Sequence, residues 1–158
     1  MKNEKIQVVN NKILKLTNVL IKEVDLKEDQ HFEKEVYQME NYLRNRGAQP
    51  LGPLIQYTNV ELNELQEPKL VIKLLRQSNT FINNVDLPYR MEPIIRVKNC
   101  MYARFRGEEN KLKFAYDKIN ITAFEEDIHL KGESYTIYIA QSDGIITADV
   151  FMERADNG

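Results

Sequence analysis

The order of hydrophobic and polar positions in the first half of the chain predicts a strand followed by a helix. Residues 18–26 are rich in β-branched side chains and partly alternate, which indicates a strand. From Asp29, a suitable N-cap, apolar residues recur every three or four positions, as in an amphipathic helix. The helix should end at Gly47, because glycine accepts the left-handed conformation and Pro50 cannot extend a helix. Its apolar positions are Phe32, Val36, Met39 and Leu43.

Two short apolar segments complete this half. Residues 54–58 and 69–75 are expected to be strands, joined by a polar connection at 59–68. Residues 77–93 show no regular pattern and carry Pro88 and Pro93, so we interpret them as a linker. The first half therefore reads β-α-β-β.

The second half repeats that order. Residues 94–105 alternate as a strand, and a helix is expected after the turn and acidic residues at 107–109. Strands at 135–139 and 145–152 are joined by a hairpin turn at Ser142-Asp143-Gly144. The helix is indicated by apolar residues at helical spacing, namely Leu112, Ala115, Tyr116, Ile119 and Ala123.

Composition narrows the class of protein. The 158 residues include 22 Lys and Arg against 24 Asp and Glu, which gives a net charge of −2. This balance does not favour binding to nucleic acid or to an anionic membrane. A chain of this length buries roughly 70% of its unfolded surface as one globular domain. Neither a signal-peptide core nor an apolar run of about 20 residues is visible. The single cysteine, Cys100, excludes an intrachain disulfide, so we expect a soluble protein of the reducing cytoplasm.

The two halves also share turn chemistry. Gly52 precedes the third element of the first half, and Gly132 stands 80 positions later before its counterpart. A single β-α-β-β unit cannot bury both of its faces, so two copies are expected to pack together and leave a groove along their seam. Ligands favour such interfaces, and this groove is where we expect function.

At this point the sequence resembles the GyrI-like domain, which is also the effector-binding part of multidrug-sensing transcription regulators. The resemblance covers residues 17–153 and rests on short motifs in a fixed order. They are Gly-Ala-Gln-Pro-Leu-Gly-Pro-Leu-Ile-Gln-Tyr at 47–57, a strand ending in Arg-Gly at 102–107, Leu112 with Ala115-Tyr116, Gly-Glu-Ser-Tyr-Thr-Ile-Tyr at 132–138, and Ala-Asp-Val-Phe at 148–151.

The resemblance implies an α+β fold of two β-α-β-β repeats in pseudo-twofold arrangement, with an antiparallel sheet and helices on one face. It implies one domain over residues 1–158, with repeat one at 17–76, a linker at 77–93 and repeat two at 94–153. Family members accept bulky, often cationic and aromatic molecules, and a strand glutamate supplies the counter-charge. Here the matching position holds Thr136. Because a hydroxyl cannot neutralise a buried cation, either Glu133 or Asp149 replaces that glutamate, or the ligand is not a cation.

Candidate ligand contacts follow from this expectation and from the flat, amphipathic side chain of tyrosine. Tyr135 and Tyr138 are three positions apart on one strand, so they cannot both line the groove. The candidate ligand-binding residues are Tyr57, Tyr102, Tyr116, Glu133, Tyr135, Thr136, Tyr138 and Asp149.

Catalysis, a metal and a cofactor are not expected. His31 and His129 have no second ligand at helical spacing, and Cys100 lies in no nucleophile motif. The sequence also lacks a phosphate-binding loop and a dinucleotide fingerprint. The family's hydrolytic members use the glutamate that Thr136 replaces here.

The function predicted from the sequence is therefore non-catalytic binding of a small hydrophobic or aromatic molecule in the groove between the repeats. The alternative is a protein-interaction module that binds a protein client, for example a topoisomerase or a secretion component. Direct nucleic-acid or membrane binding is not expected, whereas exposed strand edges would allow a homodimer.

Overall fold

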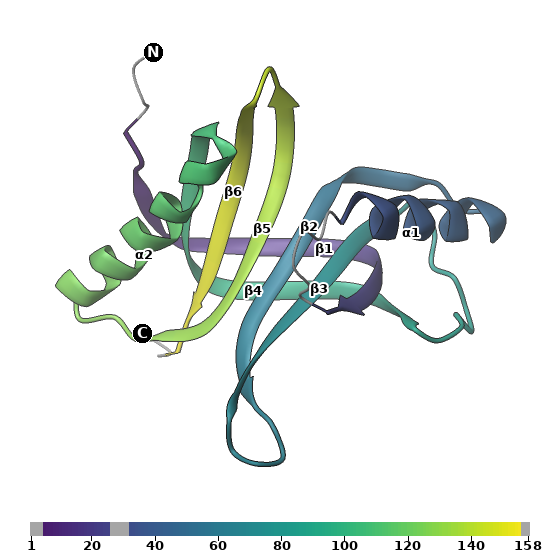
Figure 1. Cartoon of the computed structure of the whole chain (residues 1–158), viewed down its shortest axis with the longest axis horizontal. Helices are drawn as coiled ribbons and strands as arrows, with labels where there is room; N and C mark the ends of the chain where they lie inside the picture. Colours follow the sequence, from purple (N-terminus) through teal and green to yellow (C-terminus); the bar gives the residue numbers. More distant parts are fainter. Residues whose placement is uncertain (1–4, 26–31, 156–158) are drawn as a thin grey trace. The chain divides into compact units, whose positions relative to one another are not determined.

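The structure is a computed structural model that describes residues 5–25 and 32–155. Each half of the chain runs strand, helix, strand, strand (Figure 1). The strands pair antiparallel, and with two helices the chain has the predicted α+β class. The elements are β1 (Val8–Val24), α1 (Glu33–Asn45), β2 (Pro50–Leu62), β3 (Pro68–Ser78), β4 (Tyr89–Glu108), a 3-10 turn (Glu109–Lys111), α2 (Lys113–Glu125), β5 (Leu130–Ser142) and β6 (Ile145–Arg154).

The chain divides into two compact units. One consists of residues 15–96, and the other of residues 97–158 together with 1–14. Both β1 and β4 contribute residues to each unit. The boundaries between the two units therefore lie within these strands and not in the predicted linker.

In the unit of residues 15–96, β3 lies between β1 and β2, and α1 packs on β2 and β3 (Figure 1). The helix contributes Met39 and Leu43 to a buried core, and Phe32 and Val36 pack against that core as half-buried residues. The predicted helix and its end are thus confirmed, with Gly47 at a φ of 82°, but the helix begins at Glu33, later than predicted, so that Phe32 lies just before it. The buried core contains Leu20, Val24, Met39, Leu43, Ala48, Ile72, Leu74 and Ile82.

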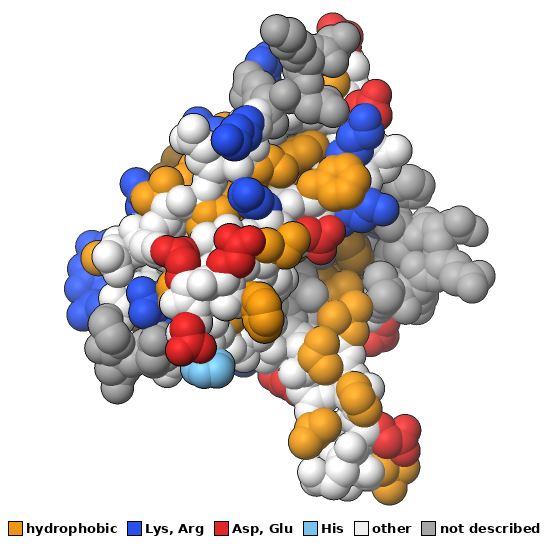
Figure 2. All heavy atoms as spheres, turned by 90° about the vertical axis from the view of Figure 1, so that its left-hand side faces the viewer, with side chains coloured by type: hydrophobic (Ala, Val, Ile, Leu, Met, Phe, Trp, Pro, Cys, Tyr) orange, Lys and Arg blue, Asp and Glu red, His pale blue; other side chains and the backbone are white. Residues whose placement is uncertain are grey.

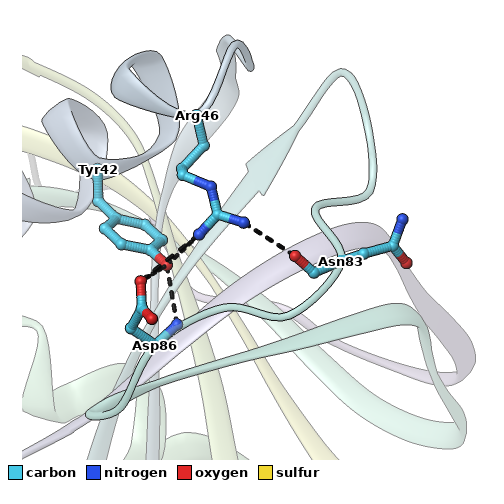
Figure 3. Close-up of polar contacts among 4 residues, drawn as sticks. All are labelled: Tyr42, Arg46, Asn83 and Asp86. Atoms are coloured by element: carbon cyan, nitrogen blue, oxygen red, sulfur yellow. Dashed lines mark hydrogen bonds and ion pairs between the residues drawn. The ribbon is translucent and has the colours of Figure 1, made fainter.

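A polar cluster ties the connection between β3 and β4 to the end of α1 (Figure 3). Tyr42 Oη accepts a hydrogen bond from the Asp86 backbone N–H at 2.9 Å and donates to Asp86 Oδ2 at 3.1 Å. Arg46 donates to Tyr42 Oη at 2.8 Å and to the Asn83 carbonyl at 2.9 Å. This connection therefore has specific contacts and a defined course.

In the unit that contains residues 97–158, β6 lies between β4 and β5, and α2 packs against β6 (Figure 1). Every second residue of the sheet faces the helix, and these residues form one apolar core. The core contains Met101, Ala103, Phe105, Leu112, Ala115, Ile119, Ala123, Ile146, Ala148, Val150 and Met152. The hairpin between β5 and β6 turns at Asp143 and Gly144, both with positive φ, as the sequence predicts.

Gly52 and Gly132 occupy similar positions in the two units. Each has a positive φ, 72° and 101° respectively, and each lies where the strand shifts register against its neighbour. Such a shift is a bulge, which glycine accommodates because it carries no Cβ. Both units thus have a bulge at a glycine, and the repeat in pseudo-twofold arrangement stays a prediction.

The first predicted strand was placed too late. β1 begins at Val8, ten positions before the predicted start at Asn18. Its alternation is hidden from sequence because Asn11 and Asn18 both have positive φ, which interrupts the alternation of faces. The predicted strand end at Leu26, the N-cap at Asp29 and His31 lie outside the described residues.

Two other segments were also assigned wrongly. Half of the polar connection at 59–68 is strand: β2 continues to Leu62 and β3 begins at Pro68, with Glu61 paired to Lys69. The linker at 77–93 is shorter than predicted because β4 already begins at Tyr89. Both errors arise where strands are exposed on both faces, so that their residues do not alternate between apolar and polar.

Over the described parts of the chain, no helix is both long and apolar enough to cross a membrane.

Candidate functional site

The two faces of the β5–β6–β4 sheet divide the candidate residues. Thr136, Tyr138 and Tyr116 belong to the face that α2 covers. Thr136 pairs with Val150 across the strands, and its hydroxyl is hydrogen-bonded to Tyr116 Oη on the helix. Tyr138 pairs with Ala148 and packs against the same core. These three residues therefore connect helix and sheet.

The opposite face of this sheet carries Asp149, which is held by two neighbours on β4. Arg104 lies opposite Asp149 and donates from Nε to Oδ1 at 2.7 Å and from Nη2 to Oδ2 at 3.0 Å. Tyr102 Oη donates to Oδ1 at 2.7 Å. The Asp149 side chain is only 11% exposed, whereas that of Arg104 is 56% exposed. A nearly buried carboxylate is thus neutralised by a cation that reaches solvent.

Aromatic rings flank this ion pair on the same face. Phe151 lies opposite both Tyr102 on β4 and Tyr135 on β5. The ring centroids of Tyr102 and Phe151 are 4.9 Å apart at an angle of 45°, a favourable aromatic contact. Lys12 Nζ lies 5.6 Å from the Tyr102 ring centroid, within cation–π range. The face therefore combines three rings with an ion pair and a second cation.

Burial and charge hold the two tyrosines of this face in the neutral form. Burial, followed by the hydrogen bond to Asp149 and its charge, raises the pKa of Tyr102 to about 12. Burial and the charges of Glu133 and Glu153 raise the pKa of Tyr135 to about 12. Asp149 in turn raises the pKa of Arg104. At neutral pH the site presents phenols and a guanidinium.

The two remaining candidates are Tyr57 and Glu133. Tyr57 belongs to the other unit, where Lys73 Nζ lies 5.2 Å from its ring centroid. Glu133 is half-buried on β5, close enough for its charge to act on Tyr135. Of the eight candidates, only Tyr102, Tyr135 and Asp149, with Glu133 nearby, share a face with the ion pair.

Sequence reasoning missed Arg104 and Phe151 as candidate site residues. Their side chains alternate with the apolar core residues of β4 and β6, and this spacing was visible. What could not be read was the register that places Arg104 opposite Asp149 and Tyr102 opposite Phe151. These strands are separated in sequence by a helix and another strand, so no turn fixes their pairing.

The remaining reactive side chains have structural surroundings. Cys100 is fully buried, its Sγ donates to the Val97 carbonyl at 3.5 Å, and burial raises the pKa of its thiol to about 11. A protonated, buried thiol is a poor nucleophile. Among the described residues, no group of His, Cys, Asp and Glu side chains is arranged to hold a metal ion.

A shallow depression of about 520 Å³ lies at the tip of the β2–β3 hairpin, lined by Glu61, Leu62, Asn63, Glu64, Leu65 and Lys69. It contains none of the candidate residues. It is open and formed by a single hairpin, whereas ligand pockets are concave and enclose most of their ligand.

No protein-family model matches the sequence, and comparison with curated proteins gives no match. Solved structures are similar in fold. EcmrR in a cryo-EM structure of the EcmrR–DNA complex in EcmrR-RPo has a TM-score of 0.68 at 14% identity, covering 94% of this chain and 57% of that one. This chain thus spans little more than half the length of EcmrR.

In two further solved structures the similarity covers both chains almost completely. A hydrolase encoded by lin2189 from Listeria innocua has a TM-score of 0.59 at 9% identity, covering 97% of this chain and 93% of that one. SAV2435 bound to tetraphenylphosphonium has a TM-score of 0.51 at 12% identity, with 96% and 94% covered. At such identities the likeness shows the fold alone, and this fold fits the GyrI-like resemblance seen in the sequence.

Proposed function

We propose that the chain binds a small aromatic molecule without converting it, and that Tyr102, Tyr135 and Phe151 contact this molecule beside the Arg104–Asp149 pair. The observation that carries the proposal is a charged pair set among three rings on the face of the sheet that α2 does not cover. Planar ligands stack on such rings, and the polar groups fix their orientation. That the groove lies between the two repeats remains a prediction from the family resemblance.

The fold is also that of SAV2435, which was solved with tetraphenylphosphonium, a cation with four aromatic rings. This supports small-molecule binding in general. In this chain, however, Asp149 is not a free counter-charge for a cationic ligand, because it already accepts two hydrogen bonds from Arg104 and one from Tyr102. We therefore propose a neutral or anionic aromatic ligand, which meets the solvent-exposed guanidinium of Arg104 without having to displace it.

The proposal assigns no catalytic role to the two reactive groups Cys100 and Asp149. Cys100 is buried and protonated at neutral pH, and the carboxylate of Asp149 is occupied by Arg104 and Tyr102. A general base must reach the proton that it removes, and this carboxylate already accepts three hydrogen bonds and is only 11% exposed. The likeness to a protein called a hydrolase, at 9% identity, carries only the fold. A cytoplasmic location stays a prediction.

Thermal unfolding with three sets of aromatic compounds of similar size tests the proposal. Neutral and anionic compounds should stabilise the chain, because a ligand at 100 times its dissociation constant adds about 2.7 kcal/mol. Tetraphenylphosphonium should stabilise the wild type less than these. Stabilisation by cations alone would contradict the proposed ligand class, and the absence of any stabilisation would contradict small-molecule binding.

A matched pair of variants makes the charge argument specific. Arg104→Gln leaves Asp149 without its cation, so we expect tetraphenylphosphonium to bind this variant more tightly than the wild type. The control is Arg90→Gln, which removes another exposed arginine that forms an ion pair, with Glu92 at 3.3 Å, in the other unit. An equal gain in both variants would show a general charge effect.

One observation favours the alternative, a module that binds a protein client. The β2–β3 hairpin exposes apolar side chains along its length, and Figure 1 shows this hairpin extending beyond α1 within its own unit. Exposed apolar patches mark interaction sites. If no compound stabilises the chain, and Leu62→Ser abolishes a specific co-purifying protein while Leu51→Ser does not, the hairpin is the functional surface. The exposed residues are Val60, Leu62, Leu65 and Leu70.

A further inference from the structure

The Arg104 guanidinium has one edge occupied by Asp149 and another edge that is open. A guanidinium presents five N–H groups in one plane. Arg104 directs Nε and Nη2 to the two oxygens of Asp149, and these two nitrogens form one edge of the plane. No hydrogen bond from the residues that the structure describes reaches the other edge, which Nη1 and Nη2 form. Because the side chain is more than half exposed, two parallel N–H groups remain for a ligand.

Asp149 holds this guanidinium in place before any ligand arrives. The carboxylate is nearly buried, and it also accepts a hydrogen bond from Tyr102 Oη at 2.7 Å. A long, exposed arginine loses conformational freedom when it binds a ligand, and this loss weakens binding. Two hydrogen bonds to a fixed anion reduce that loss for Arg104. Asp149 is therefore a positioning residue, and Arg104 is the group that meets the ligand.

Lys12 adds a positive charge at the same end of the face. Its Nζ lies 5.6 Å from the ring centroid of Tyr102, and the hydroxyl of this ring shares Oδ1 of Asp149 with Arg104 Nε. Within the described part of the chain, Lys12 forms no ion pair. Arg104 and Asp149 cancel each other, so Lys12 leaves this end of the face positive. Arg106, two positions further along β4, has contacts of its own.

The other end of the face is acidic. Glu133 and Glu153 are close enough for their charges to act on Tyr135. Glu153 forms an ion pair with Lys131 at 3.1 Å, and Glu133 has contacts of its own. Carboxylates repel an anion, so an anionic group is favoured at the Arg104 end and disfavoured beside Tyr135. The charges of this face thus orient an anionic ligand.

We propose that the ligand is an aromatic carboxylic acid, whose carboxylate accepts two hydrogen bonds from the open edge of Arg104. Its ring then lies against the rings of Tyr102, Phe151 and Tyr135. A planar carboxylate matches two parallel N–H groups, whereas the neutral amide of the same acid offers one acceptor oxygen and no charge. This inference rests on the proposed function and narrows its ligand class.

Isothermal titration calorimetry of the full chain with matched compounds tests the carboxylate. The two pairs are naphthoate with naphthamide and biphenyl carboxylate with biphenyl carboxamide, so that within each pair the rings are the same. Wild type should bind each acid about tenfold more tightly than its amide. Equal affinities for acid and amide would overturn the carboxylate subsite and leave the proposed function intact. Binding of none of the four compounds would overturn both.

Two variants of Arg104 test the residue that is assigned to the carboxylate. Arg104→Gln should bring acid and amide to about equal affinity. Arg104→Lys keeps a cation beside the buried Asp149 and so protects the fold, but an ammonium cannot present two parallel N–H groups to a second carboxylate. The preference for the acid should therefore fall to about threefold or less in Arg104→Lys. A folded Arg104→Lys variant with the full wild-type preference would overturn the proposal.

The control is Lys118→Gln, which removes one exposed positive charge of the same unit from α2, on the other side of the sheet. Figure 2 looks onto the side on which Figure 1 draws α2, and it shows basic and acidic side chains together at this surface. This variant should keep the wild-type preference for the acid. A loss as large as that in Arg104→Gln would show a general effect of net charge and would overturn the assignment to Arg104.

Discussion

Arg104 holds Asp149 through two hydrogen bonds of 2.7 and 3.0 Å, although the two side chains stand in different surroundings. The guanidinium is more than half exposed, whereas the carboxylate is almost completely buried. An exposed cation that loses its partner is rehydrated by water, but a buried anion is not. The loss of Arg104, which leaves a buried anion unpaired, should therefore destabilise the protein more than the loss of Asp149.

This inequality predicts an unequal response to mutation. Arg104→Gln leaves a buried carboxylate with Tyr102 as its remaining side-chain donor and should lower the free energy of unfolding by about 2–3 kcal/mol. Asp149→Asn keeps an oxygen that can accept the Tyr102 hydrogen bond and leaves a solvated guanidinium, so it should cost about 1 kcal/mol. Urea unfolding of both variants measures the difference. A larger loss in Asp149→Asn would contradict this account of the pair.

Position 136, where the GyrI-like resemblance implies a glutamate, is buried between the sheet and α2 in this chain. Thr136 is 2% exposed, faces α2 and is hydrogen-bonded to Tyr116. Thr136→Val should cost about 1–2 kcal/mol, because the Tyr116 hydroxyl loses its partner. Thr136→Glu should cost more than about 4 kcal/mol, because it buries an unpaired charge in the core.

The measurement is chemical unfolding, with tetraphenylphosphonium present and absent. If position 136 faced a ligand site, Thr136→Glu would be tolerated and would gain affinity for the cation. The structure instead predicts an unstable variant without such a gain. Tyr116→Phe is the matched control, since it removes the same hydrogen bond and adds no charge.

The raised tyrosine pKa values predict a loss of stability in alkali. Tyr102 and Tyr135 lose their protons near pH 12 in the folded protein and near pH 10 when unfolded. Because the folded state binds the protons more tightly, their contribution is complete below pH 10 and is lost as the pH rises through about 12. Tyrosinate absorbance, with urea unfolding at each pH, follows both effects.

Variants separate these two residues from the other tyrosines. Tyr135→Phe should remove one group from the titration phase near pH 12 and make the decline in stability shallower. Ionisation of all eight tyrosines together near pH 10 in the folded protein would contradict the burial and charges described for this face.

Cys100 should be unreactive in the folded protein. Burial raises its thiol pKa to about 11, so almost no thiolate exists at neutral pH, and the side chain is inaccessible. A thiol reagent in excess should label the native chain only as fast as it opens, while the urea-denatured chain reacts at once. Rapid stoichiometric labelling of native protein would show that the thiol is available for chemistry.

Much of the fold could be predicted from the sequence because its two helices have strong signals. Met39 and Leu43 in α1 and Ala115 and Ile119 in α2 recur at helical spacing and are buried as expected. The first strand could not be bounded, since Asn11 and Asn18 adopt positive φ and break the alternation on which strand prediction depends.

The candidate site could be predicted less well than the fold. Alternation along β5 separates Tyr135 from Tyr138, and the structure indeed places them on opposite faces. Alternation does not say which face the helix covers, however, and it does not give the register between strands that are distant in sequence. The pairing of Arg104 with Asp149 depends on the covered face and on the register. The sequence alone could therefore identify Asp149 as a candidate but could not identify its partner.

The most direct test of the proposed binding face is fluorine NMR of protein labelled with fluorotyrosine, in which each of the eight tyrosines gives its own signal. Single Tyr→Phe variants assign the signals, and a stabilising aromatic compound is then titrated. The account predicts saturable shifts at Tyr102 and Tyr135, with Tyr116 and Tyr138 nearly unchanged beneath α2. Shifts confined to Tyr116 and Tyr138, or to the tyrosines of the other unit, would contradict it.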